Sequence, residues 1–414
     1  MLVNIGILIS SFLFVLFSII GYGHLFQKIL KIDKNAINIG LTGFYGIFIL
    51  IVYSYFSNLF IAHSIYHNFL LILIGFIFFI FLTFKNKING FRKNNYLILI
   101  ISLIIILSLL IFKNHDDFSY YHFPYTYYLT QESLNIGIGQ FGHGFRTPSS
   151  IFYLNSLFYL PLIEYYSFNF GQAIVFCFAN IYFLKNINFF TQEFKLNKNS
   201  FNYINYLSLL IFIFINVFFY RISEHGTDRS AQILIFVFII ELLKLIDSRK
   251  INELKLSSIF IIPALIISLK SFYIIYGIFF VIISYYIFSI KKNIFLSLKI
   301  IFLNKFFFLF LILFFFVLLT NFFNTGCLIY PLAISCFENV QWNISIVQVQ
   351  KMNDWYELWS KAGATPNFRV EDMQNYIQYF NWLNGWIERY FFNKVSDFLL
   401  GIFFLNIVIL FTFK

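Results

Sequence analysis

Long apolar runs alternate with short polar segments along most of the chain. Many of the runs reach about 16–22 residues, the length that lets an α-helix cross the hydrocarbon core of a bilayer. Backbone polar groups must be paired inside lipid, so we expect these runs to be helices rather than open strands. The pattern predicts an all-α, polytopic transmembrane helical bundle that forms a single integral membrane domain, residues 1–414. About eleven spans are expected, near residues 2–22, 36–57, 68–84, 96–112, 169–184, 205–220, 231–246, 256–269, 272–289, 305–323 and 397–413.

One apolar stretch, SSIFYLNSLFYLPLIEYY at residues 149–166, is interrupted by Asn155 and Pro161 and contains Glu164 near its end. We interpret it as an interfacial or re-entrant segment that does not span the membrane. The basic residues support this interpretation. With the N-terminus outside, most of the 29 Lys and Arg residues then lie on the inner side, as the positive-inside rule requires. If the stretch crossed the membrane, three basic linkers further along the chain would face outward instead.

Acidic residues and histidines follow the opposite distribution. Most of the 18 Asp and Glu residues, and every His except His24, fall on the predicted outer side. They lie mainly in three loops, residues 113–167, 221–230 and 324–396. We expect the first loop to contain non-spanning helices and the third to form a small folded outer cap. The polar chemistry of the chain is therefore predicted to concentrate on the extracytoplasmic face.

The composition supports a membrane protein and argues against nucleic acid as a partner. Charged residues make up 11% of the chain, whereas soluble domains carry about a quarter. The net charge of +11 would suggest nucleic acid in a soluble protein. Here we interpret Lys and Arg as topology signals and expect no nucleic-acid partner. The 63 Phe and 28 Tyr residues have AT-rich codons, so genome composition explains much of the aromatic content without a binding surface.

The three cysteines allow more than one arrangement. Cys177 lies within a predicted span, where we expect it to pack against neighbouring side chains. Cys327 and Cys336 share the outer cap. In an oxidising compartment they would either form a disulfide or remain two free thiols. No spacing in the chain resembles a metal-binding CxxC pair.

Two of the outer loops carry residues that suit catalysis at a membrane surface. The first contains HDDFSYYHFP, and a carboxylate at the outer end of a span beside His and Tyr suits a general base. The second reads RISEHGTDRSAQ, in which Arg221 and Arg229 could bind phosphate through their forked donors. Lys270, alone between two apolar runs, either extends to the interface or holds an anion. Each residue alone fits a solvated span end, but their occurrence on one face favours a site.

The motifs HDDFSYYHFP, GTDRSAQILIF and SLKSFYIIYG, in this order, resemble the GT-C superfamily of membrane glycosyltransferases. In that family an acidic motif opens an early outer loop with juxtamembrane helices, and a second acidic motif and a basic residue follow. DFSYYHFP, GIGQFGHGFRTPSSIFYLNSLF and NTGCLIYPL further resemble an uncharacterised bacterial polytopic branch of such enzymes. The resemblance covers about residues 96–345. It implies an inverting enzyme of a bacterial inner membrane, which transfers a sugar from a polyprenyl-phosphate-linked donor to a cell-envelope glycan or lipid acceptor outside the cytoplasm.

The resemblance also implies roles for individual residues. Asp117 matches the acid of the first motif and would be the base that activates the acceptor hydroxyl, with neighbouring Asp116 as its competitor. Asp228, with Glu224 close by, would support the acceptor or a divalent cation, and no other cofactor is implied. Basic side chains would neutralise the phosphate of the departing lipid: Arg229, Lys270 and Arg221. Positioning roles would fall to His122, His143, His225 and Arg146.

The chain departs from the family pattern in two respects. The acidic loop follows the fourth predicted span rather than the first, and the chain stops directly after a span, which would leave acceptor recognition to the outer cap. The alternative function is non-catalytic, as a polysaccharide transporter or a polymerase subunit. A transporter needs a polar path across the bilayer. The predicted spans contain few ionisable groups, of which Glu241 is the main one, and this disfavours transport.

Overall fold

The computed structural model describes residues 5–32, 38–85, 98, 100–106, 117–196, 203–220, 226–248, 251–361, 370 and 372–412. Within these residues the regular secondary structure is helical, apart from one isolated bridge between Cys327 and Cys336. The prediction of an all-α chain is confirmed for this part of the sequence. The chain divides into two compact units. Unit 1 comprises Met1–Asn135 and Pro148–Leu318, and unit 2 comprises Ile136–Thr147 and Leu319–Lys414.

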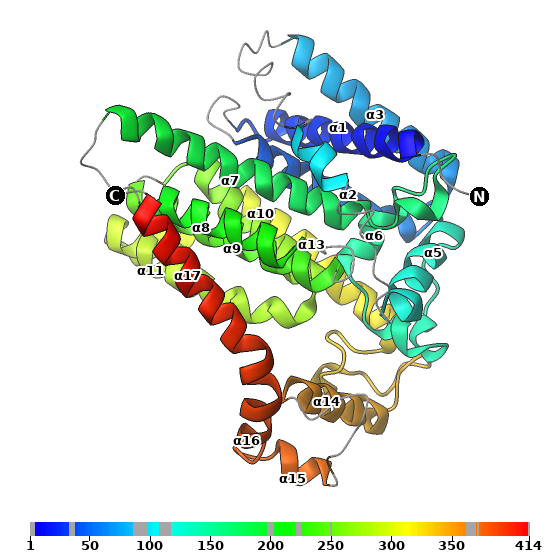
Figure 1. Cartoon of the computed structure of the whole chain (residues 1–414). Helices are drawn as coiled ribbons and strands as arrows, with labels where there is room; N and C mark the ends of the chain where they lie inside the picture. The colour runs from blue at the N-terminus through cyan, green and yellow to red at the C-terminus, as the bar shows by residue number, and fades with distance from the viewer. Residues whose placement is uncertain are drawn as a thin grey trace. The chain divides into compact units, whose positions relative to one another are not determined.

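Unit 1 is a bundle in which helices that are close in sequence also pack together. α1 contacts both α2 and α3, and α7, α8, α9 and α10 run side by side (Figure 1). Among the described residues, the helices of unit 1 include α1 (Ile5–Ile29), α2 (Ile39–Asn58), α3 (Ile65–Lys85), η1 (Phe118–His122), α5 (Phe123–Gln131), α6 (Ser150–Ser156), η4 (Glu164–Ser167), α7 (Phe170–Leu196), α8 (Tyr203–Phe218), α9 (Gly226–Ser248), α10 (Glu253–Leu269), η6 (Ser271–Gly277), α11 (Ile278–Lys291), α12 (Ile294–Phe302) and α13 (Lys305–Thr325), which continues into unit 2.

Glycines let the first three helices approach one another closely. A Cβ atom added to Gly46 of α2 would overlap the carbonyl oxygen of Ile19 in α1. One added to Gly23 of α1 would overlap the carbonyl oxygen of Thr42 in α2, and Gly21 lies equally close to the backbone of α3. Small residues are typical of helix contacts in membranes, where close packing replaces the hydrophobic effect as the cause of association. The sequence of this region therefore fits helices that pack inside a bilayer.

Six helices among the described residues are long and apolar enough to cross a membrane, and a bent pair, Leu383–Asn393 with Ser396–Val408, would make a seventh. The six are Ile5–Ile29, Ile39–Asn58, Ile65–Leu82, Glu164–Ile187, Ser271–Lys291 and Lys305–Thr325. Each overlaps a span that the hydrophobic pattern predicts. The structure thus supports an integral membrane bundle, whereas the count of about eleven spans is not reached.

The other predicted spans differ for physical reasons. Residues 205–220 and 256–269 fall on apolar helices that are shorter than a span, Tyr203–Phe218 and Leu254–Leu269. Residues 231–246 lie inside α9, which also carries charged side chains at both ends. Most of the predicted span 96–112 lies outside the described residues. The stretch 149–166 forms the seven-residue helix α6, then turns, then η4, so it is not one continuous helix.

Unit 2 contains short helices that follow the last turns of α13 and precede an apolar helix, α17. Figure 1 shows α17 continuing from α16 through a bent helical segment. Residues 136–147 of the first outer loop also belong to unit 2, so that loop contributes to both units. The helices of unit 2 are η2 (Ile138–Gln140), η3 (His143–Arg146), η7 (Ala333–Ser335), α14 (Ile346–Ser360), α15 (Met373–Ile377), α16 (Leu383–Trp386), η8 (Ile387–Val395) and α17 (Ser396–Thr412).

Candidate functional site

Two predicted site residues from separate motifs meet in unit 1. Asp228 lies in the first turn of α9, and Lys270 caps the end of α10. These two helices are consecutive and packed together, so the start of α9 lies beside the end of α10. The Lys270 Nζ atom forms an ion pair with Asp228 Oδ1. The side chains of Lys270 and Asp228 are 45% and 43% exposed, so the pair is accessible to a ligand and adds little to stability.

Arg229 follows Asp228 and lies against the end of α8. Its guanidinium carbon is 4.3 Å from the centroid of the Phe219 ring, within the range of a cation–π interaction. Its Nη1 atom donates to Oε1 of Gln232, one turn along α9, at 3.0 Å. The guanidinium is therefore held at the same end of α9 as the Asp228–Lys270 pair. We call these three residues, Asp228, Arg229 and Lys270, the charged cluster.

Helix α6 connects the charged cluster to the first acidic motif. The hydroxyl of Ser149, which caps α6, donates to the carbonyl oxygen of Leu269 at 2.5 Å, directly beside Lys270. One turn further along α6, the ring of Phe152 lies 5.2 Å from the ring of His122. His122 ends η1, and Asp117 is the residue that precedes η1. The non-spanning segment predicted from the sequence therefore lies between the two motifs of the first and second outer loops.

The predicted positioning residues fall into different environments. His122 is buried, and its carbonyl oxygen accepts a hydrogen bond from the Thr126 hydroxyl at 2.8 Å. His143 and Arg146 belong to unit 2, where Arg146 Nε donates to the carbonyl oxygen of Gly139 at 2.9 Å. Burial, and secondarily the charge of Arg146, lower the pKa of the His143 imidazole. Their roles towards the charged cluster stay predictions. Four further candidates lie outside the described residues: Asp116, Arg221, Glu224 and His225.

A buried histidine network, to which the sequence assigns no role, holds α6 in place. His63 follows α2 and is fully buried. Its Nδ1 atom is hydrogen-bonded to the Ser156 hydroxyl of α6 at 2.7 Å, and its Nε2 atom to the Ser57 hydroxyl of α2 at 3.0 Å. The amide of Asn68 donates to the carbonyl oxygen of Ser156 at 2.8 Å. Burial lowers the pKa of His63 to about 3, so the ring is a neutral structural link. The signal in the sequence is HSIYHN, two histidines and an amide at the start of α3 (Ile65–Lys85).

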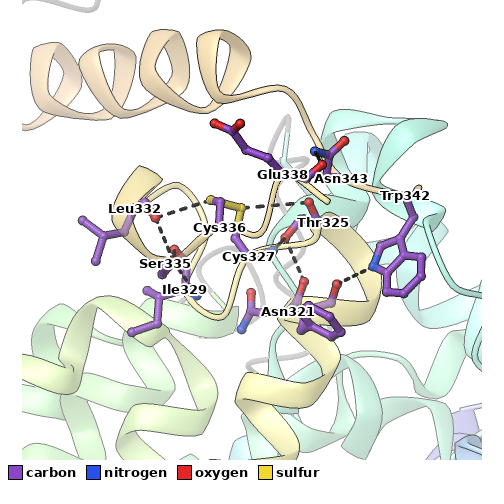
Figure 2. The surroundings of a disulfide bond; sticks show 11 residues. Asn321, Thr325, Cys327, Ile329, Leu332, Ser335, Cys336, Glu338, Trp342 and Asn343 are labelled. Carbon is purple, nitrogen blue, oxygen red and sulfur yellow. Dashed lines mark hydrogen bonds between the residues drawn. A yellow bond between two sulfur atoms is a disulfide. The ribbon is translucent and has the colours of Figure 1, made fainter. Parts of the chain in front are cut away.

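The disulfide between Cys327 and Cys336 decides between the two arrangements that the sequence leaves open. Figure 2 shows it in the loop that follows α13, where the Ser335 hydroxyl donates to the carbonyl oxygen of Ile329 at 2.9 Å. The indole nitrogen of Trp342 donates to the carbonyl oxygen of Phe322 at 2.9 Å. These contacts attach the start of the cap to the last turns of α13.

Almost the whole sequence matches the model of one protein family. The chain matches the family model described as a domain of unknown function, DUF8201, over residues 5–414. It belongs to that family. No curated protein and no solved structure is significantly similar to the chain.

The geometry of this DUF8201 protein suits the binding of an anion. The charged cluster combines two basic side chains with one carboxylate at the first turn of a helix, where the partial positive charge of the helix also attracts anions. Among the described residues, no group of three or more His, Cys, Asp and Glu side chains could hold a metal ion. A divalent cation at Asp228 therefore stays an expectation from the resemblance.

Proposed function

We propose that this DUF8201 protein is a GT-C-type inverting glycosyltransferase. It would transfer a sugar from a polyprenyl-phosphate-linked donor to a cell-envelope glycan or lipid acceptor, on the extracytoplasmic face of a bacterial inner membrane. The observation that carries the proposal is the accessible ion pair between Asp228 and Lys270 beside Arg229. Two motifs that are far apart in the sequence supply this cluster, in the order that the resemblance to the family requires.

The charged cluster fits a lipid-linked phosphate better than it fits a free soluble anion. Directly after Lys270, the chain presents exposed apolar side chains: Phe272, Ile275 and Ile278 are 70%, 64% and 64% exposed. In a candidate membrane span, such side chains face lipid. A polyprenyl chain could lie along this surface while its phosphate reaches Lys270 and Arg229.

The proposed reaction uses one carboxylate as a base and the cations as a phosphate site. Asp117 accepts the proton of the acceptor hydroxyl, and the hydroxyl oxygen forms a bond to the anomeric carbon of the sugar. The bond between that carbon and the phosphate oxygen breaks, and the polyprenyl phosphate leaves with the electron pair. Lys270 and Arg229 stabilise the charge that develops on this oxygen. Attack from the face opposite the phosphate inverts the anomeric centre.

We propose that the chain crosses the membrane about eleven times, as the sequence pattern predicts, and that the six candidate spans are among these crossings. Under the positive-inside rule, the ends of α9 and α10 that carry the charged cluster then face away from the cytoplasm, together with Asp117. An independent fusion-reporter or cysteine-accessibility map of the basic linker 290–304 would test this orientation. Labelling of that linker from outside the cell would overturn it.

A deletion strain complemented with single variants tests the function. We expect loss of one envelope glycan decoration on deletion, and its recovery with the wild-type chain. Asp117→Asn should reduce turnover about 10²–10⁴-fold, because it removes the general base, while the protein inserts at the wild-type level. Lys270→Met should act mainly on donor use and cause the polyprenyl-phosphate-linked sugar to accumulate.

The matched control is Lys299→Met, an exposed basic residue on the apolar helix α12, which should complement fully. Wild-type glycan in the Asp117→Asn strain would refute the role of Asp117. An unchanged glycan profile in the deletion strain itself would refute the transferase proposal as a whole.

A further inference from the structure

All five tryptophans of the chain lie in one short stretch, residues 342–386, within unit 2. Phe and Tyr are abundant everywhere and are encoded by AT-rich codons. Tryptophan has a single, G-rich codon, so an AT-rich genome would reduce its frequency rather than raise it. The concentration of tryptophan in the cap therefore needs a structural or functional cause.

The tryptophans serve different purposes. Trp342 is structural, because its indole nitrogen bonds to the backbone of α13 and its ring packs on Phe322 at 5.6 Å. Trp355 and Trp359 belong to α14 and are 39% and 52% exposed. They are four residues apart, so they lie on one face of the helix, separated by roughly 6 Å along its axis. That spacing is close to the length of one pyranose unit.

The exposure of these rings does not come from a loosely attached helix. Val349 and Leu358 of α14 are fully buried. Val349 packs into a cluster with Cys327, and Leu358 packs against Ile377 of α15. The helix is thus held by its other side chains, while two large indole rings, which usually contribute to cores or interfaces, stay half in solvent.

The helix that carries the two rings also carries polar side chains held by fixed contacts. Asp354 accepts a hydrogen bond from the Gln374 amide at 2.9 Å. Glu357 is paired with Lys361, whose Nζ atom also donates to the carbonyl oxygen of Ile377 and lies 5.8 Å from the Trp382 ring. Aromatic rings stack on the C–H face of a sugar, and carboxylates and amides on the same helix can hydrogen-bond its hydroxyls.

We propose that the face of α14 that carries Trp355 and Trp359, the tryptophan platform, binds the carbohydrate chain of the acceptor. This inference rests on the proposed transferase function and names the place where its acceptor is held. A lipid surface is the competing partner for exposed tryptophan. Interfacial segments, however, have a basic excess on their polar face. Here two acidic side chains, Asp354 and Glu357, balance Lys351 and Lys361.

The distribution of tryptophan provides the assay, because the intrinsic indole emission of the full-length chain comes from unit 2 alone. The purified chain in detergent is titrated with delipidated, protease-treated envelope polysaccharide from the host cell. We expect a saturable change in emission. The double variant Trp355→Ala/Trp359→Ala should weaken the apparent Kd by about tenfold or more, and Trp359→Phe, which keeps a ring, should lose much less. Trp386→Phe, in α16, is the matched control and should bind as the wild type does.

Two results would overturn the proposal. One is the absence of a saturable change with polysaccharide, or equal binding by the double variant and the wild type. The other is quenching of Trp359 by brominated lipid in nanodiscs together with no response to polysaccharide, which would assign the platform to the bilayer. The titration needs no donor and should be unchanged in Asp117→Asn. If the purified chain bound polysaccharide but the deletion strain kept all its glycans, the transferase proposal would be refuted. The proposal that the tryptophan platform binds carbohydrate would still stand.

Discussion

Acidification should loosen helix α6, because His63 joins it to α2 as a neutral ring. The imidazole is fully buried between the hydroxyls of Ser57 and Ser156. It also stacks on His67, with ring centroids 5.6 Å apart. A proton on His63 would place a charge in this enclosed site and remove one acceptor from the network. Since α6 contacts both His122 of the first motif and Leu269 beside the charged cluster, the effect would reach the candidate site.

The magnitude follows from the difference in the pKa of His63 between the folded and unfolded chain. Burial, and secondarily the neighbouring His67, lower the pKa of His63 from 6.5 to about 3. Between these two pH values the unfolded chain binds a proton that the folded chain does not. The free energy of unfolding is therefore highest above pH 6.5 and falls as the pH decreases through 6.5 towards 3. At pH 5 the loss should be about 2 kcal/mol, from about 1.4 kcal/mol for each pH unit below 6.5.

The assay compares unfolding of the purified chain in detergent at pH 7.5 and pH 5.0, followed by circular dichroism during titration with SDS. His63→Gln removes the titrating ring, so its unfolding free energy should fall about 2 kcal/mol less between the two pH values than that of the wild type. His67→Gln, in the same stack, keeps His63 and is the matched control. An equal loss in wild type and His63→Gln would refute the reasoning, whatever the stability of either protein at pH 7.5.

Three further predictions concern packing and covalent links. Glu241→Ala should lower the free energy of unfolding by about 3 kcal/mol, because it leaves Lys244 without its buried partner. The double variant Glu241→Ala/Lys244→Ala should recover part of this loss in the same SDS titration. A double-variant loss equal to the sum of the two single losses would contradict the pairing. Gly46→Ala should cost about 1–3 kcal/mol, since its Cβ atom would meet the carbonyl oxygen of Ile19, whereas Gly277→Ala, which meets nothing within 4 Å, should cost far less. Cys336→Ser should destabilise unit 2 by about 2–3 kcal/mol, because the disulfide closes a loop between cysteines nine residues apart. The variant should also shift the tryptophan emission. Emission equal to that of the wild type throughout an unfolding titration would refute this prediction.

The hydrophobic pattern is sufficient to place the six candidate spans of the described residues, because a long apolar run has few alternatives in lipid. It places α2 within a few residues, from Ile39 to Asn58 rather than 36–57. It fails at α9, where charged residues belong to the helix itself: the helix begins at Gly226 and already contains Asp228 in its first turn. A search for apolar windows cannot detect charged helix ends such as the first turn of α9. The partners of their polar side chains come from other helices and are known only once the chain has folded.

The candidate site shows the same division between local and tertiary information. The meeting of Asp228 and Lys270 follows from the alternation of helices, because the start of α9 and the end of α10 must lie at the same end of a helical pair. The role of His63 does not follow, since its partner Ser156 is 93 residues away and serine hydroxyls carry no sequence signal. The assignment of His143 to unit 2 likewise depends on packing that no local motif encodes.

A buried carboxylate in the bundle, Glu241, forms a fixed contact with Lys244 rather than an exchangeable one. Among the side chains that the structure describes, Glu241 is the only buried Asp, Glu, Lys or Arg. Its carboxylate accepts hydrogen bonds from Tyr182 at 2.5 Å, Lys244 at 2.9 Å and Ser258 at 2.9 Å.

This network is closed, because each oxygen of Glu241 already has a donor from the protein and Lys244 reaches the Asn186 amide oxygen at 3.1 Å as well. A transport path needs charged groups that exchange partners as the substrate moves. The Glu241–Lys244 pair instead joins α7, α9 and α10 as a fixed contact. The charged cluster, at the opposite end of α9, is by contrast accessible: the side chains of Lys270 and Asp228 are 45% and 43% exposed.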